Sequence, residues 1–429
     1  MTTYHIAAPD RLNTQVKLPA SKSISNRALI ICALSEIDRH KGSVLAPDAY
    51  LPDNLSDCDD TEVILHALRN MPPTIDIHGA GTAMRFMTAY LAATPSGTHT
   101  LTGSERMKHR PIKPLVEALR CLGADIAYEG EEGFPPLRIT GRTLEGGLVE
   151  IAGNMSSQFV SALLLIGPML KKGLMLRLLG DIISRPYIDL TIWIMNEFGA
   201  QVEWSSVDTI TVEPKPYARR SYIIESDWSA ASYWYEMMAL TNDDEAEVKL
   251  LGLMDGSRQG DSSVRYIFSL LGVKTSFAAR RQGQLTTVTL RKNHHCVPRM
   301  DYDFTGAPDL AQTVIATCCA MNVPFRFTGL QTLRIKETDR IMALKTELRK
   351  LGYNVVDGDQ GELLWEGDFV SDTPPDQSIN TYDDHRMALS FAPLALRHTI
   401  VIRQPQVVSK SYPHFWSDME KAGFSISTP

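Results

Sequence analysis

The chain has 429 residues, of which 44% are hydrophobic and 22% charged, and its formal net charge is -7. This length predicts two or three domains, and the negative charge excludes general affinity for nucleic acid or acidic membranes. The N-terminal residues lack the basic start and apolar stretch of a signal peptide, and no apolar run of membrane-spanning length is free of charge. We therefore expect a cytoplasmic protein with no nucleic-acid and no membrane partner.

A repeated pattern organises the chain. Glycine is favoured just beyond a helix C-terminus, because it adopts the left-handed backbone without a steric penalty. An amphipathic helix ending in glycine is predicted at residues 115–123, 190–199, 264–272, 344–352 and 415–423, with a weaker copy at 64–70 that has Asn70 instead. A second helix per unit is expected near residues 25–35, 81–93, 156–169, 227–240, 308–320 and 384–395, with strands such as 174–179 and 248–253 between them. The pattern predicts an α/β fold of about six copies of one unit, with helices packed against small sheets.

The stretch 18–27 reads Leu-Pro-Ala-Ser-Lys-Ser-Ile-Ser-Asn-Arg and precedes an apolar run at 28–34. It places Lys22, Ser23, Ser25 and Arg27 where Ser and Asn would cap a helix through the apolar run. A helix start carries free N–H donors and partial positive charge, so added cations predict an anion site, with phosphate as the expected ligand. The alternative is a capped surface helix with two solvated cations.

Five later loops put Arg, Lys or Ser at or just before a helix N-terminus, where anions are favoured. These loops are residues 106–111, 184–187, 257–261, 334–340 and 409–412. If the units converge, the loops form a basic cleft within an acidic protein, suited to small polyanions.

Two further stretches could bind such ligands. Ser156, Ser157 and Gln158 open an apolar helix and offer hydroxyls, an amide and backbone donors. Residues 79–85 form a glycine-containing turn that enters a helix, which lets backbone N–H groups approach a ligand. Capping alone explains one of the two serines.

Residues 336–340 could supply an acid or base. One interpretation is that Lys336 and Arg340 share a helix face and bind an anion, while Glu337 points elsewhere as an acid or base. The alternative is a solvated helix start whose charges pair with one another. Asp309, before an apolar run, is a plausible helix-start residue.

Metal and disulfide chemistry are not expected. Residues 383–386 read Asp-Asp-His-Arg, but no second His lies at ligand spacing and the adjacent Arg386 opposes a cation. The six cysteines form neither a Cys-x-x-Cys motif nor a disulfide framework, so we expect buried thiols.

Taken together, these motifs resemble the 5-enolpyruvylshikimate-3-phosphate (EPSP) synthase family. The resemblance rests on residues 18–27, 80–85, 106–111, 156–158, 184–187, 308–309, 334–340, 384–388 and 409–410, in family order along nearly the whole chain. It implies transfer of the enolpyruvyl group of phosphoenolpyruvate to the 5-hydroxyl of shikimate 3-phosphate with release of phosphate. It also implies a monomer with no metal or organic cofactor.

The family fold is two similar domains, each of three repeated α/β units, of the inside-out α/β barrel type. By similarity, residues 1–18 and 226–429 form one discontinuous domain and residues 19–225 an inserted domain, with the active site in the cleft between them and Lys22 at the hinge.

The resemblance also assigns roles to residues. Asp309 is the implied base for the 5-hydroxyl, Glu337 the implied proton donor to the methylene carbon, and Lys22 a further catalytic residue that touches both ligands. Shikimate 3-phosphate would be bound by Lys22, Ser23, Arg27, Ser156, Ser157, Gln158, Ser184, Tyr187, Asp309, Thr332 and Lys336. Phosphoenolpyruvate would be bound by Lys22, Gly81, Arg110, Gln158, Arg340, Arg386 and Lys410.

Three features depart from the family pattern. Gly79 and Thr332 stand where the family often has Asn, which removes one side-chain contact to phosphoenolpyruvate and weakens one to shikimate 3-phosphate. Residues 38–52 form a longer surface loop than usual. Two alternatives therefore stay open: a catalytically impaired homologue that binds phosphorylated metabolites, and the related enolpyruvyl transferase acting on UDP-N-acetylglucosamine.

Overall fold

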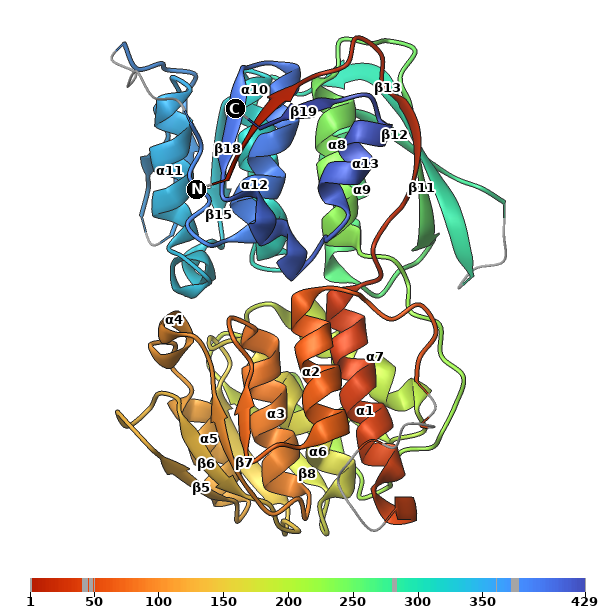
Figure 1. Ribbon diagram of the computed structural model, residues 1–429, viewed down its shortest axis with the longest axis vertical. Coiled ribbons are helices and arrows are strands. Elements are labelled where there is room, and N and C mark those ends of the chain that lie inside the picture. Colours follow the sequence, from red (N-terminus) through yellow and green to blue (C-terminus); the bar gives the residue numbers. More distant parts are fainter. Residues whose placement is uncertain are drawn as a thin grey trace. The chain divides into compact units, whose positions relative to one another are not determined.

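The structure is a computed structural model that describes residues 2–40, 45, 49, 51–279, 284–359, 361–371 and 378–428. The chain forms two compact units (Figure 1), which we call unit 1 (Met1–Pro19 with Glu225–Pro429) and unit 2 (Ala20–Ile224). The expected domain boundaries lie one residue away from these. Much of the predicted loop at residues 38–52 lies outside the described residues.

Four sheets of four strands share one topology. In chain order the strands lie 1-2-4-3, and only the first two are parallel. In unit 1 they are β2 (Asn13–Lys17), β11 (Glu247–Met254), β13 (Leu285–Cys296) and β12 (Leu271–Phe277), and then β14 (Met300–Asp303), β15 (Phe325–Thr328), β17 (Leu363–Trp365) and β16 (Val356–Asp357). In unit 2 they are β3 (Thr74–Asp76), β4 (Thr98–Thr102), β6 (Leu137–Thr140) and β5 (Asp125–Tyr128), and then β7 (Gly147–Ala152), β8 (Leu174–Leu179), β10 (Thr209–Val212) and β9 (Val202–Trp204). Unit 2 is inserted in the crossover between β2 and β11.

The remaining two repeats have reduced sheets. In unit 1, β1 (Thr3–Ala7) lies between β18 (Ile400–Arg403) and β19 (Ser425–Ser427), so the N-terminal strand completes the last repeat. A parallel bridge joins Ile379 to Ile402 where the first strand of that repeat would pair. In unit 2, the corresponding parallel bridge joins Asp53 to Ile223.

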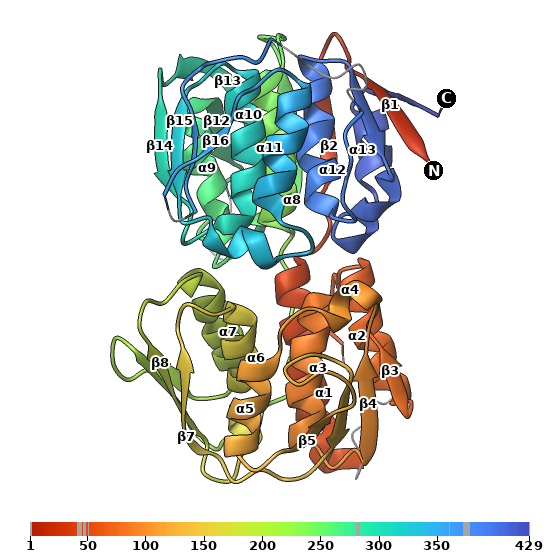
Figure 2. The ribbon, with the colours of Figure 1, turned by 90° about the vertical axis from the view of Figure 1, so that its left-hand side faces the viewer.

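Each repeat supplies one inner and one outer helix. The inner helices are α1 (Lys22–His40), α3 (Gly81–Ala93) and α6 (Ser157–Ile166) in unit 2, and α8 (Trp228–Leu240), α10 (Ala311–Ala320) and α12 (His385–Phe391) in unit 1. The outer ones are α2 (Asp59–Asn70), α5 (Lys113–Cys121), α7 (Arg185–Glu197), α9 (Val264–Ser269), α11 (Arg340–Lys350) and α13 (Phe415–Lys421), and α4 (Glu105–Lys108) is a short extra turn. Figures 1 and 2 show the inner helices side by side within each unit, with strands outside them.

Burial follows from this inside-out arrangement. Every residue of α10 and α12 is buried, whereas β8 alternates strictly between buried and exposed residues. Each fully buried large apolar side chain contributes roughly 1.5–3 kcal/mol, so the inner helices form the core of their unit. No helix in the described part of the chain is long and apolar enough to cross a membrane.

The predicted helix ends are largely confirmed. Gly123, Gly199, Gly272, Gly352 and Gly423 all have positive φ. The weaker copy differs, because Asn70 is the last residue of α2 and Met71 takes the left-handed backbone. The expectation of buried thiols is wrong for Cys121 and Cys296, which are exposed.

Candidate active site

The start of α1 differs from the predicted capped helix. The helix begins at Lys22, so Ser23, Ser25 and Asn26 lie inside its first turns. The hydroxyl of Ser25 accepts from the backbone N–H of Ser56 at 3.1 Å, and the Asn26 side-chain oxygen accepts from the Thr61 hydroxyl at 2.8 Å. These tertiary hydrogen bonds satisfy groups that sequence reasoning assigned to capping.

Arg27 is a buried cation among neutral oxygens. Its guanidinium donates to the Thr191 hydroxyl at 2.7 Å, the Ser161 hydroxyl at 3.0 Å and the Ser23 carbonyl at 2.9 Å. Within the part of the chain that the structure describes, no carboxylate lies at ion-pair distance from it. Burial lowers the pKa of Arg27 to about 10. An uncompensated buried charge is costly, so this position favours an anionic ligand.

Other starts of helices in unit 2 meet through side chains. Gln158, near the start of α6, donates from Nε2 to the Thr82 hydroxyl at the start of α3, at 3.1 Å. The hydroxyl of Ser156 caps α6, as predicted. Ser184 precedes α7 with φ of 53°, a left-handed backbone rare for a residue other than glycine.

Arg110 lies against the start of α3. A Cβ added at Gly81 would lie 2.6 Å from Arg110 Nη1, so only glycine admits the guanidinium there. The buried Nε of Arg110 has no hydrogen-bond partner among the described residues. Lys22, at the start of α1, places Nζ 3.7 Å from Asp60 Oδ2. Unit 2 thus presents cations, hydroxyls and helix N-termini, all suited to binding phosphate.

In unit 1, Asp309 is the centre of a charged cluster. It lies in a short 3₁₀ turn, Pro308–Leu310, ahead of α10. Its carboxylate is 3.1 Å from Arg386 Nη2, 3.1 Å from Arg340 Nη1 and 3.8 Å from Lys336 Nζ. Burial opposes its ionisation, but the charges of Arg386, Lys336 and Arg340 outweigh burial and hold the pKa of Asp309 well below its usual range.

Of the two interpretations of residues 336–340, the shared helix face is wrong, whereas the expected pairing of charges within the stretch is found. Helix α11 begins at Arg340, so Lys336 lies in the preceding loop and the two cations do not share a helix face. Glu337 does not point elsewhere, because its Oε2 accepts from Arg340 Nη2 at 2.8 Å. Arg340 also donates from Nε to Asp384 Oδ2 at 2.7 Å. These carboxylates raise the pKa of Arg340 against the effect of burial.

Two predicted residues lie at the edge of the cluster. Lys410 donates to the Asp383 carbonyl at 2.7 Å. Thr332, in the 3₁₀ helix Gln331–Ile335, has a buried hydroxyl without a hydrogen-bond partner among the described residues. Burial lowers the pKa of Lys336, so its ammonium group loses a proton more readily than that of an exposed lysine.

Sequence reasoning missed several polar residues of these sets. Asp384 caps α12 by accepting from the backbone N–H of Arg386 at 2.9 Å, in addition to binding Arg340. The position of Asp384 just before an apolar helix is the sequence signal that could have predicted this cap. Ser161 and Thr191 lie inside apolar helices, and only the fold brings them to Arg27.

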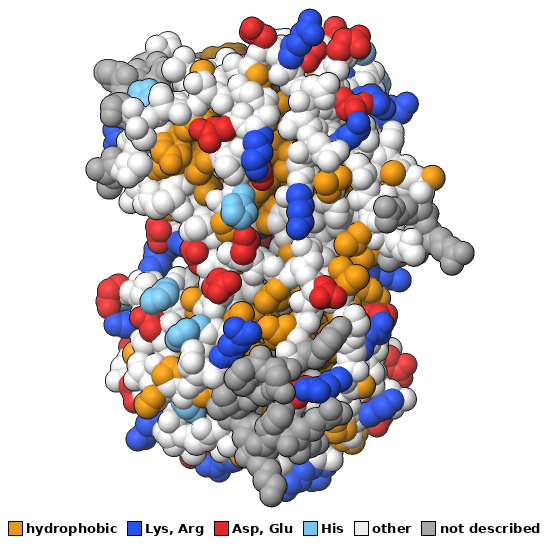
Figure 3. All heavy atoms as spheres, turned by 45° about the vertical axis from the view of Figure 1, so that its right-hand side comes forward, with side chains coloured by type: hydrophobic (Ala, Val, Ile, Leu, Met, Phe, Trp, Pro, Cys, Tyr) orange, Lys and Arg blue, Asp and Glu red, His pale blue; other side chains and the backbone are white. Residues whose placement is uncertain are grey.

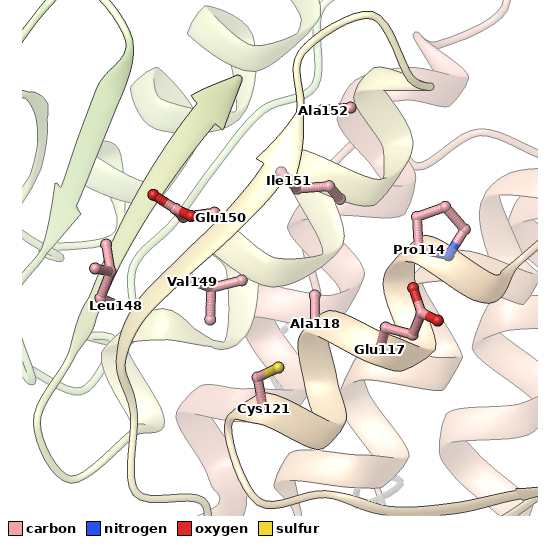
Figure 4. Close-up of a pocket in the computed structure, with 9 residues that line it drawn as sticks. All are labelled: Pro114, Glu117, Ala118, Cys121, Leu148, Val149, Glu150, Ile151 and Ala152. Atoms are coloured by element: carbon pink, nitrogen blue, oxygen red, sulfur yellow. The ribbon is translucent and has the colours of Figure 1, made fainter. Parts of the chain in front are cut away.

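A separate hollow in unit 2 is not suited to phosphate. It lies between α5 and β7 and has a volume of about 450 Å³ (Figure 4). Glu117 and Glu150 are its charged lining residues, and no cation among the described residues lines it. Acidic and basic side chains are interspersed on the face shown in Figure 3.

The two sets of side chains offer cations and hydroxyls suited to small phosphorylated ligands and buried carboxylates suited to proton transfer, the residue types of a transferase acting on such ligands. The model of the protein family described as "EPSP synthase (3-phosphoshikimate 1-carboxyvinyltransferase)" matches residues 6–419 of the chain. The chain belongs to the EPSP synthase family.

Individual relatives agree with this. A Bacteroides fragilis protein named 3-phosphoshikimate 1-carboxyvinyltransferase is 54% identical over 425 residues, which cover 99% of this chain and 98% of that protein. A Photobacterium profundum protein of the same name is 34% identical and covers 95% of this chain and 96% of its own length. The UDP-N-acetylglucosamine alternative and the impaired-homologue alternative are not favoured.

Solved structures share the fold. An EPSP synthase from Acinetobacter baumannii is similar with a TM-score of 0.76 and 20% identity, covering 100% of both chains. The enolpyruvyl transferase NikO from Streptomyces tendae is similar with a TM-score of 0.69 and 15% identity, and the match covers 100% of this chain and 99% of that one.

Proposed function

We propose that the phosphate-binding set of unit 2 and the Asp309 cluster of unit 1 both act on phosphoenolpyruvate and shikimate 3-phosphate. The chain is a 3-phosphoshikimate 1-carboxyvinyltransferase of aromatic amino acid biosynthesis. The observation that supports the division of roles is Arg27, a buried cation in unit 2 that contacts neutral oxygens. Unit 1 has instead a buried cluster of carboxylates and guanidinium groups.

Shikimate 3-phosphate is a dianionic phosphate on a ring with hydroxyls. Arg27, with the hydroxyls of Ser23, Ser156, Ser157 and Ser184, matches this chemistry. Each charge-assisted hydrogen bond to the phosphate contributes on the order of 1.5–3 kcal/mol. We assign Lys22, Gln158, Tyr187, Thr332 and Lys336 to the same ligand, together with Asp309 at the 5-hydroxyl.

Phosphoenolpyruvate carries a phosphate and a carboxylate. Arg110 beside Gly81, together with Arg340, Arg386 and Lys410, provides bidentate and single contacts to both groups. Lys22 and Gln158 touch both ligands. Occupation by the ligand would compete with Asp309 for Arg386, which frees the carboxylate for the reaction.

The reaction proceeds by addition and elimination. The 5-oxygen attacks C2 of phosphoenolpyruvate while its proton passes to Asp309, and Glu337 delivers a proton to C3. The C2–O bond to phosphate then breaks and a C3 proton leaves, which restores the double bond and releases inorganic phosphate. The cations stabilise the charge that develops on phosphate and carboxylate.

Phosphate release by the purified protein tests this function. Release should require both phosphoenolpyruvate and shikimate 3-phosphate, and should not occur with UDP-N-acetylglucosamine. Release only with the UDP-sugar would overturn the assignment. No release with either acceptor, together with retained binding of shikimate 3-phosphate, would point to the impaired homologue. The cytoplasmic location and the monomeric state stay predictions from the sequence.

A further inference from the structure

Asp261 is a buried carboxylate next to the Asp309 cluster that has no assigned role. It lies in the 3₁₀ turn Gly260–Ser263 and is 4% exposed. Gln259, two residues before Asp261, fixes this turn to the segment that leads into α8. Its Nε2 donates to Glu225 Oε2 and to the Ser226 carbonyl, both at 2.9 Å. Its Oε1 accepts from the backbone N–H of Trp228 at 3.2 Å. The hydrogen bonds of the Gln259 side chain therefore fix the turn that carries Asp261.

The hydroxyl of Ser229 connects Asp261 to Arg386. Ser229, in the first turn of α8, donates its hydroxyl hydrogen to Asp261 Oδ2. The hydroxyl oxygen of Ser229 in turn accepts a hydrogen bond from Arg386 Nη2 at 3.4 Å. Arg386 meanwhile binds Asp309 through Nη2 at 3.1 Å and donates from Nη1 to the Asp309 carbonyl at 3.0 Å. Nη2 of Arg386 thus contacts both the Asp309 carboxylate and the Ser229 hydroxyl, which is bound in turn to Asp261.

The contact of Arg386 with the Asp309 carboxylate and its contact with Ser229 differ during the reaction. In the proposed mechanism Asp309 takes a proton from the 5-hydroxyl and loses its charge, so its attraction for Arg386 weakens when Arg386 has to hold the developing phosphate and carboxylate charge. Arginine has a long, flexible side chain whose ordering has an entropic cost of about 2 kcal/mol. A contact independent of Asp309 keeps that ordering in place.

We propose that Asp261, acting through Ser229, is a positioning residue that holds Arg386 for phosphoenolpyruvate throughout the reaction. This inference rests on the proposed assignment of Arg386 to phosphoenolpyruvate. Asp261 does not touch the reacting atoms, and it acts on Arg386 through the hydroxyl of Ser229.

The test is a double-mutant cycle with Asp261→Ala, Ser229→Ala and the double variant. Each single variant should raise the KM for phosphoenolpyruvate by about tenfold, the effect of one charge-assisted hydrogen bond. The KM for shikimate 3-phosphate should change by less than about twofold, because Arg386 serves the other ligand. The double variant should resemble the single ones, since both substitutions break the same connection.

Two results would overturn the proposal. Additive effects in the double variant would show that Asp261 and Ser229 act independently, and an unchanged KM for phosphoenolpyruvate would show that Arg386 needs neither. Asp261→Asn guards against misfolding of the alanine variant: its side-chain oxygen still accepts from Ser229, so it should raise the KM less than Ser229→Ala does. An Arg386→Lys variant distinguishes a failure of this proposal from a failure of the proposed function. An unchanged KM for phosphoenolpyruvate in that variant would refute the assignment of Arg386 to this ligand.

Discussion

Replacing Gly81 with alanine should selectively weaken phosphoenolpyruvate binding. The added methyl carbon would lie 2.6 Å from Arg110 Nη1 and 3.1 Å from Cζ and Nη2. Ordinary contact begins near 3.4 Å, so the guanidinium has to move by about 0.8 Å. The clash is with the far end of a flexible side chain, so α3 itself stays in place and the thermal stability should hardly change.

The expected magnitude follows from the contact that is lost. Misplacing one charge-assisted hydrogen bond weakens binding by on the order of 1.5–3 kcal/mol, which is roughly a 10- to 100-fold rise in the KM for phosphoenolpyruvate. Steady-state phosphate release at saturating shikimate 3-phosphate measures it. Gly130→Ala is the matched control, because its added carbon meets Pro136 at an ordinary 3.7 Å. A normal KM in the Gly81 variant would refute the placement of Arg110 at this ligand.

Three further outcomes are expected. Asp309→Asn and Glu337→Gln should lower kcat by at least about 100-fold with little change in the Kd of shikimate 3-phosphate, measured by calorimetry, because they remove proton transfer and keep the shape of the site; near-normal turnover in the double variant would contradict both roles. Arg27→Met should abolish shikimate 3-phosphate binding while leaving the unliganded protein as stable or up to about 3 kcal/mol more stable, since burial lowers the pKa of Arg27 to about 10; a large loss in urea unfolding would argue against a binding role. Burial, and then the charge of Asp309, raises the pKa of Asp261 to about 6 from 3.8, with Arg386 opposing and Asp227 adding to the rise. Ionised Asp261 therefore destabilises the fold above pH 6 by up to about 3 kcal/mol and no longer does so below about pH 4, so Asp261→Asn should raise the melting temperature at pH 8 but not at pH 4, and a lower melting temperature at pH 8 would contradict this.

Much of the fold could be predicted because its signals are local. The glycine after each outer helix adopts the positive φ that glycine tolerates best, and α3 and β8 lie at the predicted residues. Helices α10 and α12 are buried on all sides, which explains the apolar runs that they contain. The common 1-2-4-3 strand order and the insertion of unit 2 between β2 and β11 depend on pairing of distant strands, which composition does not reveal.

The site was less predictable because its contacts are tertiary. Asp309 looked like an ordinary helix-start residue, yet the fold surrounds it with Arg386, Arg340 and Lys336. The polar groups that satisfy Arg27 come from α6 and α7, far away in the sequence. Asp261 had no sequence signal beyond a basic loop, and only its burial beside Ser229 shows its connection to Arg386.

The most direct test of the central claim, that carboxylates of the Asp309 cluster drive addition and elimination, is to run the reaction in D₂O and measure deuterium in the product by mass spectrometry. Protonation of C3 followed by loss of a C3 proton predicts deuterium in the methylene group of the product, and much less of it with the Glu337→Gln variant. A product free of deuterium, formed at a normal rate, would mean that C3 is never protonated and would contradict the account.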